Sequence, residues 1–206
     1  MKKRIISFLA VLSLCLLVLP AALTAGTQAA DGGGTLTLGT FSRPIKADDR
    51  LVDSAGTYSY DGSTHTLTLN NFKYSADWKN LQSGIVTLEG ATYAIFLHSS
   101  IPDLKVELIG ENEFIDTSAR YIKVSDSSTT NPMSVGIRTD SGCSITFTGT
   151  GSLTIKTSSY PMTINGSVSI EGGAKLNTTS QMNGVRIQND LTVKTGSKLT
   201  ARCDPS

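Results

Sequence analysis

The sequence predicts an all-β protein: a right-handed, single-stranded parallel β-helix with three strands in each rung, preceded by an N-terminal β-hairpin cap. Three observations indicate this fold. Apolar and polar residues alternate over short runs, which is typical of strands with one buried face. Gly-rich corners separate the runs. The whole pattern of three runs then returns after about 23 residues.

The period is clearest in the third strand of each repeat. We expect this strand to begin at Phe114, Leu153, Leu176 and Leu199 in successive rungs. The last three residues are 23 positions apart (176 − 153 and 199 − 176). The first interval is 39 residues (153 − 114), which predicts one repeat plus an insertion of about 16 residues within 116–134.

The first and second strands of each repeat carry pairs of inward-facing residues two positions apart. On the first strand these pairs are Ile95 and Leu97, Ile137 and Thr139, Met162 and Ile164, and Val185 and Ile187. On the second strand they are Val106 and Leu108, Ile145 and Phe147, Val168 and Ile170, and Leu191 and Val193. Stacked rungs bury these residues in ladders spaced by about 4.8 Å. A flat β-sandwich is the alternative fold, but it does not require a fixed period.

Residues 31–92 are predicted to form the N-terminal cap and first coil, and residues 93–206 the rungs. Within the cap, residues 57–69 indicate a β-hairpin whose turn is Asp61-Gly62. Runs 34–39 and 84–89 are expected to join it. A cap keeps the end of the β-helix from pairing with other strands, whereas the last rung offers an uncapped edge for end-to-end association.

Residues 1–30 have the features of a secretory signal peptide. A basic start, Met1–Arg4, precedes an apolar run over residues 5–19 that is shorter than the ~20 residues of a membrane span. Cleavage after Ala25, Ala29 or Ala30 satisfies the preference for small residues, and the choice among the three stays open. We therefore expect a secreted or cell-surface protein that has no membrane contact after cleavage.

Cleavage also changes the charge balance and the cysteine count. It removes three basic residues and leaves 15 basic (18 − 3) and 17 acidic side chains, so no basic excess indicates nucleic-acid binding. Two cysteines remain. Cys143 is expected to align with Leu104, and Cys203 to end the third strand two rungs later, about 10 Å away along the axis. A disulfide requires Cα atoms within about 7 Å, so none is predicted, and Cys143 is interpreted as a buried core residue.

Two segments carry a family resemblance: residues 58–71, Tyr-Ser-Tyr-Asp-Gly-Ser-Thr-His-Thr-Leu-Thr-Leu-Asn-Asn, and residues 151–155, Gly-Ser-Leu-Thr-Ile. The chain from about residue 55 to 203 resembles the secreted or cell-surface parallel β-helix repeat proteins of Gram-positive gut bacteria. Some similar β-helices are implicated in carbohydrate binding. The resemblance implies a surface role and does not identify a ligand.

The pattern does not indicate catalysis. Polysaccharide lyases and hydrolases on this fold present clustered carboxylates on neighbouring rungs, and no outward column of the predicted rungs stacks two of them. His65 and His98 lack the ligand spacing of a zinc site. No enzyme activity, metal or cofactor is therefore predicted.

The best candidates for recognition are a few exposed aromatic and basic residues. Arg120 and Tyr121 lie in the insertion and would stack on and hydrogen-bond a sugar, as would Trp78 near the first coil. Arg138 and Arg186 share a face two rungs apart, where they would meet an acidic glycan. A passive loop and solvated charges are the alternative interpretations of these residues.

The leading hypothesis is a non-catalytic exported surface protein, a carbohydrate-binding or adhesin-like β-helix module whose partner is a polysaccharide or a host glycan. A rigid structural spacer without a ligand, and a polysaccharide lyase or hydrolase, are the alternatives.

Overall fold

A computed structural model describes residues 36–38, 45–46, 48–53, 55–76, 91–97, 99, 101–117 and 133–204. All of them belong to one compact unit, residues 33–206. The predicted signal peptide lies outside the described residues. Every regular element in the described part is a β-strand. No helix among these residues has the length and hydropathy to cross a membrane.

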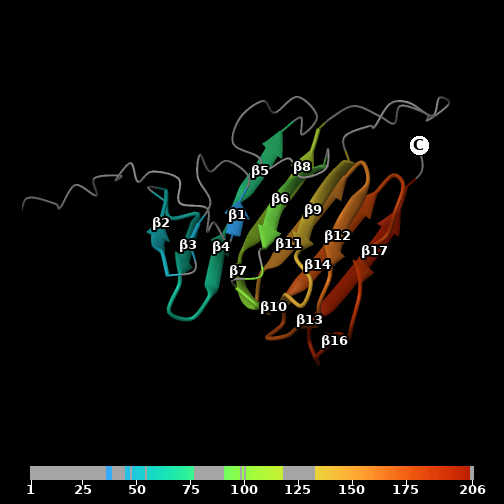
Figure 1. The fold of residues 1–206 in the computed structure, drawn as a ribbon. Coiled ribbons are helices and arrows are strands. Elements are labelled where there is room, and N and C mark those ends of the chain that lie inside the picture. The colour runs from blue at the N-terminus through green and yellow to red at the C-terminus, as the bar shows by residue number, and fades with distance from the viewer. Residues whose placement is uncertain are drawn as a thin grey trace, which may run out of the picture. The chain divides into compact units, whose positions relative to one another are not determined.

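The strands form three sheets, here called A, B and C (Figure 1). Sheet A contains, in spatial order, β1 (Leu36–Leu38), β6 (Ala91–Leu97), β9 (Met133–Thr139), β12 (Tyr160–Ile164) and β15 (Arg186–Ile187). Sheet B contains β2 (Arg50–Val52), β3 (Tyr58–Asp61), β4 (Thr66–Asn70), β7 (Asp103–Ile109), β10 (Ser144–Gly149), β13 (Val168–Ile170) and β16 (Leu191–Val193). Sheet C contains β5 (Lys73–Ala76), β8 (Glu111–Asp116), β11 (Ser152–Thr157), β14 (Lys175–Ser180) and β17 (Lys198–Cys203).

From β6 onward the chain visits sheets A, B and C in turn, and each strand pairs in parallel with its equivalent in the next rung. Figure 1 shows β11, β14 and β17 side by side in this order. The architecture is the predicted parallel β-helix with three strands per rung. Leu153, Leu176 and Leu199 lie in register, which confirms the 23-residue period of the later rungs.

The core lies between the three sheets and consists of their inward-facing apolar side chains. On sheet B the buried positions of β10 and β13 are Ile145, Phe147, Val168 and Ile170. Sheet A adds Ile137 and Ile164, both fully buried. The predicted first-strand pairs are in register, since Ile95 pairs with Ile137 and Leu97 with Thr139.

The predicted register is wrong in the third strand of the first complete rung. Leu153 pairs with Asn112, and Phe114 pairs with Ile155. The strand therefore begins two residues earlier than predicted, and the interval to the next rung is 41 residues (153 − 112) rather than 39. A polar residue occupies the first ladder position here, which is why the apolar pattern pointed to Phe114 instead.

The second strand of that rung has the same two-residue error. Ile145 pairs with Leu104 rather than with Val106. Ser144 pairs with Asp103. Cys143 therefore does not align with Leu104 as predicted but lies two positions earlier, at the level of Pro102. Cys143 is buried, as expected for a core residue, and burial raises the pKa of its thiol. Cys203 is exposed at the end of β17, and both cysteines are free thiols in this structure.

The cap contains the predicted hairpin, formed by antiparallel β3 and β4. Its turn differs from the prediction, because Asp61 pairs with Thr66 and four residues, 62–65, connect the strands. His65, with φ at 47°, takes the left-handed conformation in this turn, and Asp61 accepts hydrogen bonds from the backbone and hydroxyl of Ser63 at 2.9 and 2.7 Å. A two-residue Asp-Gly turn is therefore not formed.

The connections from sheet C to sheet A differ most in length. β8 ends at Asp116 and β9 begins at Met133, which brackets the predicted insertion. A second long connection, not predicted, runs from Ala76 to Ala91. By contrast, the connection from β11 in sheet C to β12 in sheet A consists only of Ser158 and Ser159.

Candidate functional site

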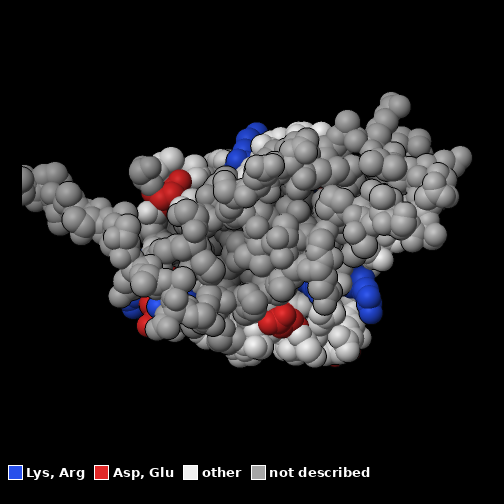
Figure 2. Space-filling view, turned by 45° about the horizontal axis from the view of Figure 1, so that its top comes forward, with Lys and Arg blue, Asp and Glu red and all other residues white. Residues whose placement is uncertain are grey.

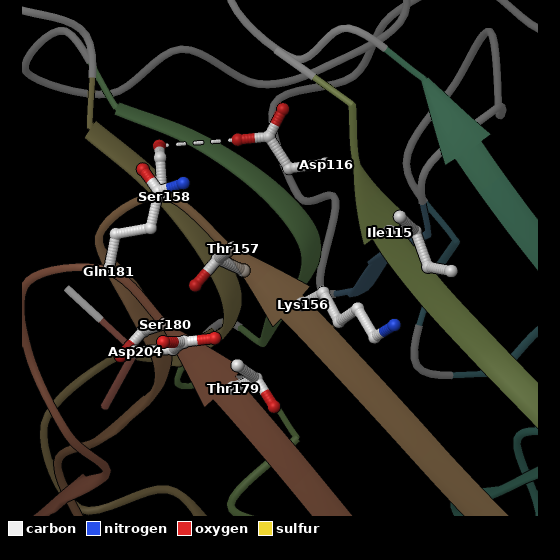
Figure 3. A pocket seen from close by; sticks show the side chains of 9 residues that line it. All are labelled: Ile115, Asp116, Lys156, Thr157, Ser158, Thr179, Ser180, Gln181 and Asp204. Atoms are coloured by element: carbon white, nitrogen blue, oxygen red, sulfur yellow. Dashed lines mark hydrogen bonds between the residues drawn. The ribbon is translucent and has the colours of Figure 1, made fainter. Parts of the chain in front are cut away.

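A pocket of about 250 Å³ lies where the strands of sheet C end and turn toward sheet A (Figure 3). Its walls come from β8, β11 and β14 and from the residues that follow these strands and β17. It is lined by Ile115, Asp116, Lys156, Thr157, Ser158, Thr179, Ser180, Gln181 and Asp204. The volume lies just below the range of about 300–1,000 Å³ that is usual for small-molecule sites.

Strand alternation explains why this pocket is polar. On β11 the inward-facing residues are Leu153, Ile155 and then Thr157, so the apolar ladder changes to a hydroxyl at the end of the strand. Thr157 pairs with Ser180, which is also buried. Lys156 pairs with Thr179 on the opposite face of the same two strands. The corner therefore presents hydroxyl groups where the rest of sheet C presents apolar side chains.

One wall of the pocket is held by a short hydrogen-bond chain. The hydroxyl of Ser158 donates to the Asp116 carboxylate at 3.2 Å, and the backbone N–H of Ser158 donates to the hydroxyl oxygen of Ser134 at 2.9 Å. The two serine hydroxyl oxygens are 2.6 Å apart. Because the Ser158 proton is directed to Asp116, the Ser134 hydroxyl must donate to Ser158. The chain orients the Asp116 carboxylate at the pocket wall.

Two residues that line the pocket each have a buried side-chain atom without a hydrogen-bond partner. These atoms are the hydroxyl oxygen of Thr157 and the carboxamide oxygen of Gln181. Thr157 is only 5% exposed, so water does not readily supply the missing hydrogen bond to its hydroxyl group. Figure 3 shows the Thr157 hydroxyl directed to the Gln181 side of β11, while the Lys156 ammonium group extends to the other side. Buried polar atoms are nearly always paired in folded proteins, so each exception needs an explanation, such as a functional role or a bound water or ion.

The two carboxylates of the pocket are far apart. Asp116 ends β8, whereas Asp204 follows β17, three strands away across sheet C. Three strand spacings amount to about 14 Å. Glycosidases place their two carboxyl groups about 5–10 Å apart, so this pair does not have that arrangement. Among the described residues, no cluster of three His, Cys, Asp or Glu side chains has the geometry of a metal site.

The outward columns of the described strands do not stack carboxylates either. Glu113 is flanked in register by Lys73 and Thr154, and Glu107 by Thr68 and Thr148. Figure 2 shows that the acidic and basic side chains described on the face in view are scattered rather than gathered in one patch.

No family model, curated protein or solved structure matches the chain. The resemblance carried by residues 58–71 and 151–155 stays a prediction.

The residues proposed from the sequence do not line this pocket. Arg138 and Arg186 share one column of sheet A, two rungs apart, with Thr163 between them, as predicted. Arg138 is half-buried and Arg186 is exposed. Arg120, Tyr121 and Trp78 lie outside the described residues.

Sequence reasoning missed Thr157, Gln181 and Asp204. A signal for the first two exists, because the hydroxyl residues Thr157 and Ser180 are 23 positions apart (180 − 157), which is the period of the rungs, and Gln181 directly follows Ser180. Hydroxyl residues at inward positions in two successive rungs indicate a polar opening in the core. Asp204 carries no such pattern.

Proposed function

We propose that this chain is an exported, non-catalytic carbohydrate-binding or adhesin-like module that holds a sugar unit in the corner pocket of sheet C. The observation that carries this proposal is the pair of buried atoms without partners, the Thr157 hydroxyl and the Gln181 carboxamide oxygen. A bound sugar supplies hydroxyl groups that both donate and accept hydrogen bonds, and it would satisfy both atoms once these two side chains turn toward it. The small volume suits one sugar unit of a longer chain.

The arrangement of the scaffold supports binding rather than turnover. The pocket walls are anchored in the sheet, since Thr157 and Ser180 are paired residues of β11 and β14. Its carboxylates, Asp116 and Asp204, lie about 14 Å apart across three strand spacings, which is too far for the acid and base of a glycosidase. A rigid wall with unpaired polar atoms favours recognition.

The test is the binding of immobilised glycans by the wild-type protein and by Thr157→Val. The substitution keeps the shape of the side chain and removes one hydroxyl, so it should weaken binding about fivefold. Thr154→Val is the matched control, because Thr154 lies on the other face of the same strand and does not line the pocket. Equal binding by wild type and Thr157→Val would refute the site, and no binding to any glycan by wild type would leave a structural spacer.

Export is a separate part of the proposal, and the basic start and apolar run of residues 1–30 support it. N-terminal sequencing of the protein from the culture medium and from the cell wall should give a chain that begins after Ala25, Ala29 or Ala30. An intact N-terminus found only inside the cells would contradict export.

A further inference from the structure

The outward face of sheet C is basic over three neighbouring strands. β11, β14 and β17 lie side by side (Figure 1), and their residues include no aspartate or glutamate. They carry four basic residues, Lys156, Lys175, Lys198 and Arg202, all of them exposed. Within the described part of the chain, none of these four side chains has an ion-pair partner. We call the outward residues of the three strands the basic face: Ser152, Thr154, Lys156, Lys175, Asn177, Thr179, Lys198, Thr200 and Arg202.

The acidic residues of sheet C lie at the borders of the basic face. Glu113, on β8, forms an ion pair with Lys73 at 3.4 Å, and Glu111 begins the same strand. Asp116 ends β8 and is hydrogen-bonded within the protein. Asp204 directly follows β17 and is exposed. Even with Asp204 counted, the basic face keeps three net positive charges (4 − 1).

The register of the strands arranges the four cations in two pairs. Lys175 pairs directly with Lys198, one strand spacing of about 4.8 Å away, and like charges in this position repel each other. Lys156 and Arg202 are both in register with Thr179, so two strand spacings, about 10 Å, separate them. Thr179 lies four positions after Lys175 (179 − 175), about 13 Å along the strand. A ligand that contacts both pairs must therefore be elongated and carry more than one negative charge.

The part of the basic face between the two pairs is polar and uncharged. Thr154, Asn177 and Thr200 form its middle column. Asn177 is exposed, and its carboxamide offers both a donor and an acceptor, as the hydroxyl groups of a sugar do. No residue of the basic face is aromatic, whereas single-stranded nucleic acids stack their bases on aromatic side chains. The chemistry of the face thus favours an anionic sugar polymer over a nucleic acid.

We propose that the basic face binds a linear polysaccharide that carries anionic groups along its length. Lys175 with Lys198, and Lys156 with Arg202, contact these anionic groups, and Asn177 hydrogen-bonds the sugar hydroxyls between them. The strands hold the cations on a rigid support, since β14 is paired over six residues with β11 and with β17. A bound anion also relieves the repulsion between Lys175 and Lys198.

This inference goes beyond the sugar site proposed for the corner pocket and does not depend on it. Lys156 and Thr179 belong to both surfaces, and Figure 3 shows them at the rim of the pocket. Lys175 and Lys198 begin their strands and do not line the pocket. Substitutions at these two lysines therefore test the basic face alone.

The experiment uses two polymers of equal chain length, carboxymethylcellulose and hydroxyethylcellulose. They share a β-1,4-linked glucose backbone and differ in whether the substituent is charged. Isothermal titration of the wild-type protein at low salt should give about tenfold tighter binding of the anionic polymer. This preference should shrink as sodium chloride is added, because salt screens exposed charges. Single-stranded oligothymidine is the third probe and should bind more weakly than carboxymethylcellulose.

Two double variants separate the basic face from general attraction of an anion. Lys175→Gln with Lys198→Gln should weaken binding of carboxymethylcellulose about fivefold, and Lys175→Arg with Lys198→Arg should keep it. The matched control is Lys105→Gln with Arg186→Gln, which removes two exposed positive charges from sheets B and A. It should change the affinity less than about twofold.

Several results would overturn the inference. One is binding at the wild-type level by Lys175→Gln with Lys198→Gln, and another is an equal loss in the control variant, since the attraction would then be general. Equal affinity for the two cellulose derivatives would show that charge is not recognised. Tighter binding of oligothymidine, lost in the same lysine variant, would assign the face to nucleic acid. None of these results bears on the corner pocket, because Thr157→Val tests that site separately.

Discussion

Asn112 is a polar residue at a buried ladder position that leucine occupies in the next three rungs. Its side-chain oxygen accepts a hydrogen bond from the backbone N–H of Phe72 at 2.8 Å. Its side-chain nitrogen donates to the carbonyls of Ile109 and Ser152 at 3.2 and 3.1 Å. One side chain thus ties together three successive coils at the corner between sheets B and C.

We predict that Asn112→Leu destabilises the protein, although leucine matches the apolar ladder. The substitution leaves the buried N–H of Phe72 without its acceptor, and it should lower the free energy of unfolding by about 1–3 kcal/mol. Urea denaturation measures this change. Asn177→Leu, on the exposed face of β14, is the control and should shift the value by less than about 0.5 kcal/mol. A fully stable Asn112→Leu protein would show that packing outweighs these hydrogen bonds.

Thr157 leads to a prediction of opposite sign. Its buried hydroxyl has no partner, so Thr157→Val should raise the free energy of unfolding of the ligand-free protein by about 1 kcal/mol. Thr178 is an equally buried residue on the next strand, but its hydroxyl donates to the carbonyl of Thr200 at 3.5 Å. Thr178→Val should therefore lower stability. A loss of stability in both variants would indicate that the Thr157 hydroxyl has a structural partner.

Two tyrosines make stability depend on alkaline pH. Burial, followed by nearby aspartates, raises the pKa of Tyr60 from 10.0 to about 12, and burial followed by Asp116 does the same for Tyr74. Because the folded pKa lies above the unfolded one, the stabilisation is complete below pH 10 and is lost as the pH rises toward 12.

Each tyrosine should therefore contribute a fall of about 1.4 kcal/mol per pH unit in this window. Urea denaturation between pH 9 and pH 11.5 measures the slope, and Tyr60→Phe or Tyr74→Phe should reduce it. An unchanged slope in both variants would assign the alkaline transition to other groups.

At the scale of the element, the turns between strands limit which residues are allowed. Gly149, at the end of β10, has φ at 92°, and an added Cβ would lie 2.4 Å from the carbonyl oxygen of Leu108. Gly142 also has a positive φ, 80°, but an added Cβ there meets nothing within 4 Å. Alanine substitutions at the two glycines therefore separate two free-energy costs: that of the left-handed backbone conformation and that of the steric contact.

Gly142→Ala should lower the free energy of unfolding by about 1 kcal/mol, the cost of the left-handed conformation. Gly149→Ala should lower it by a further 1–3 kcal/mol, roughly, because the backbone of the neighbouring rung must move. Thermal unfolding of both variants measures the difference. Equal losses of stability in the two variants would show that the neighbouring rung moves away from the added methyl group at no cost in free energy.

Gly149 also shows why the strands were predictable from the sequence and their register was not. Alternation identified β7 and β10 as strands. However, β7 has three buried inward residues, Leu104, Val106 and Leu108, and the pattern does not say which of them begins the ladder. The structure pairs Leu108 with Gly149, a residue without a side chain, and such a pairing leaves no apolar signal. Asn112 has the same effect on β8, because a polar residue at its first inward position gives no apolar signal for the start of the strand.

The candidate site was less predictable, because it depends on residues from several rungs meeting at one corner. Asp116 and Asp204 are 88 positions apart (204 − 116) and approach the same pocket only through the stacking of four strands. Sequence reasoning searched the outward columns for paired carboxylates. Thr157 is an inward residue at the end of a strand, and it becomes visible as a site only when its hydroxyl proves to have no partner.

At the scale of the whole molecule, burial decreases sharply over the last described rung. Val168 and Ile170 on β13 are 1% and 0% exposed, whereas their register partners on β16, Leu191 and Val193, are 47% and 44% exposed. Each rung of a repeat protein contacts only its neighbours, so a rung with one covered face has about half of the stabilising contacts. The rung formed by β15–β17 should therefore open before the inner rungs.

Native-state hydrogen exchange tests this gradient at two equivalent amides. The N–H of Glu171 donates to the carbonyl of Phe147 at 2.9 Å, and one rung later the N–H of Lys194 donates to that of Ile170 at 2.8 Å. The hydrogen bonds are alike, but β16 lies against β13 and has no further strand beside it among the described residues. We expect the Lys194 amide to exchange at least tenfold faster, through local opening of β15–β17. Equal protection at the two amides would mean instead that all rungs unfold together, with the exposed leucine and valine of β16 covered in solution.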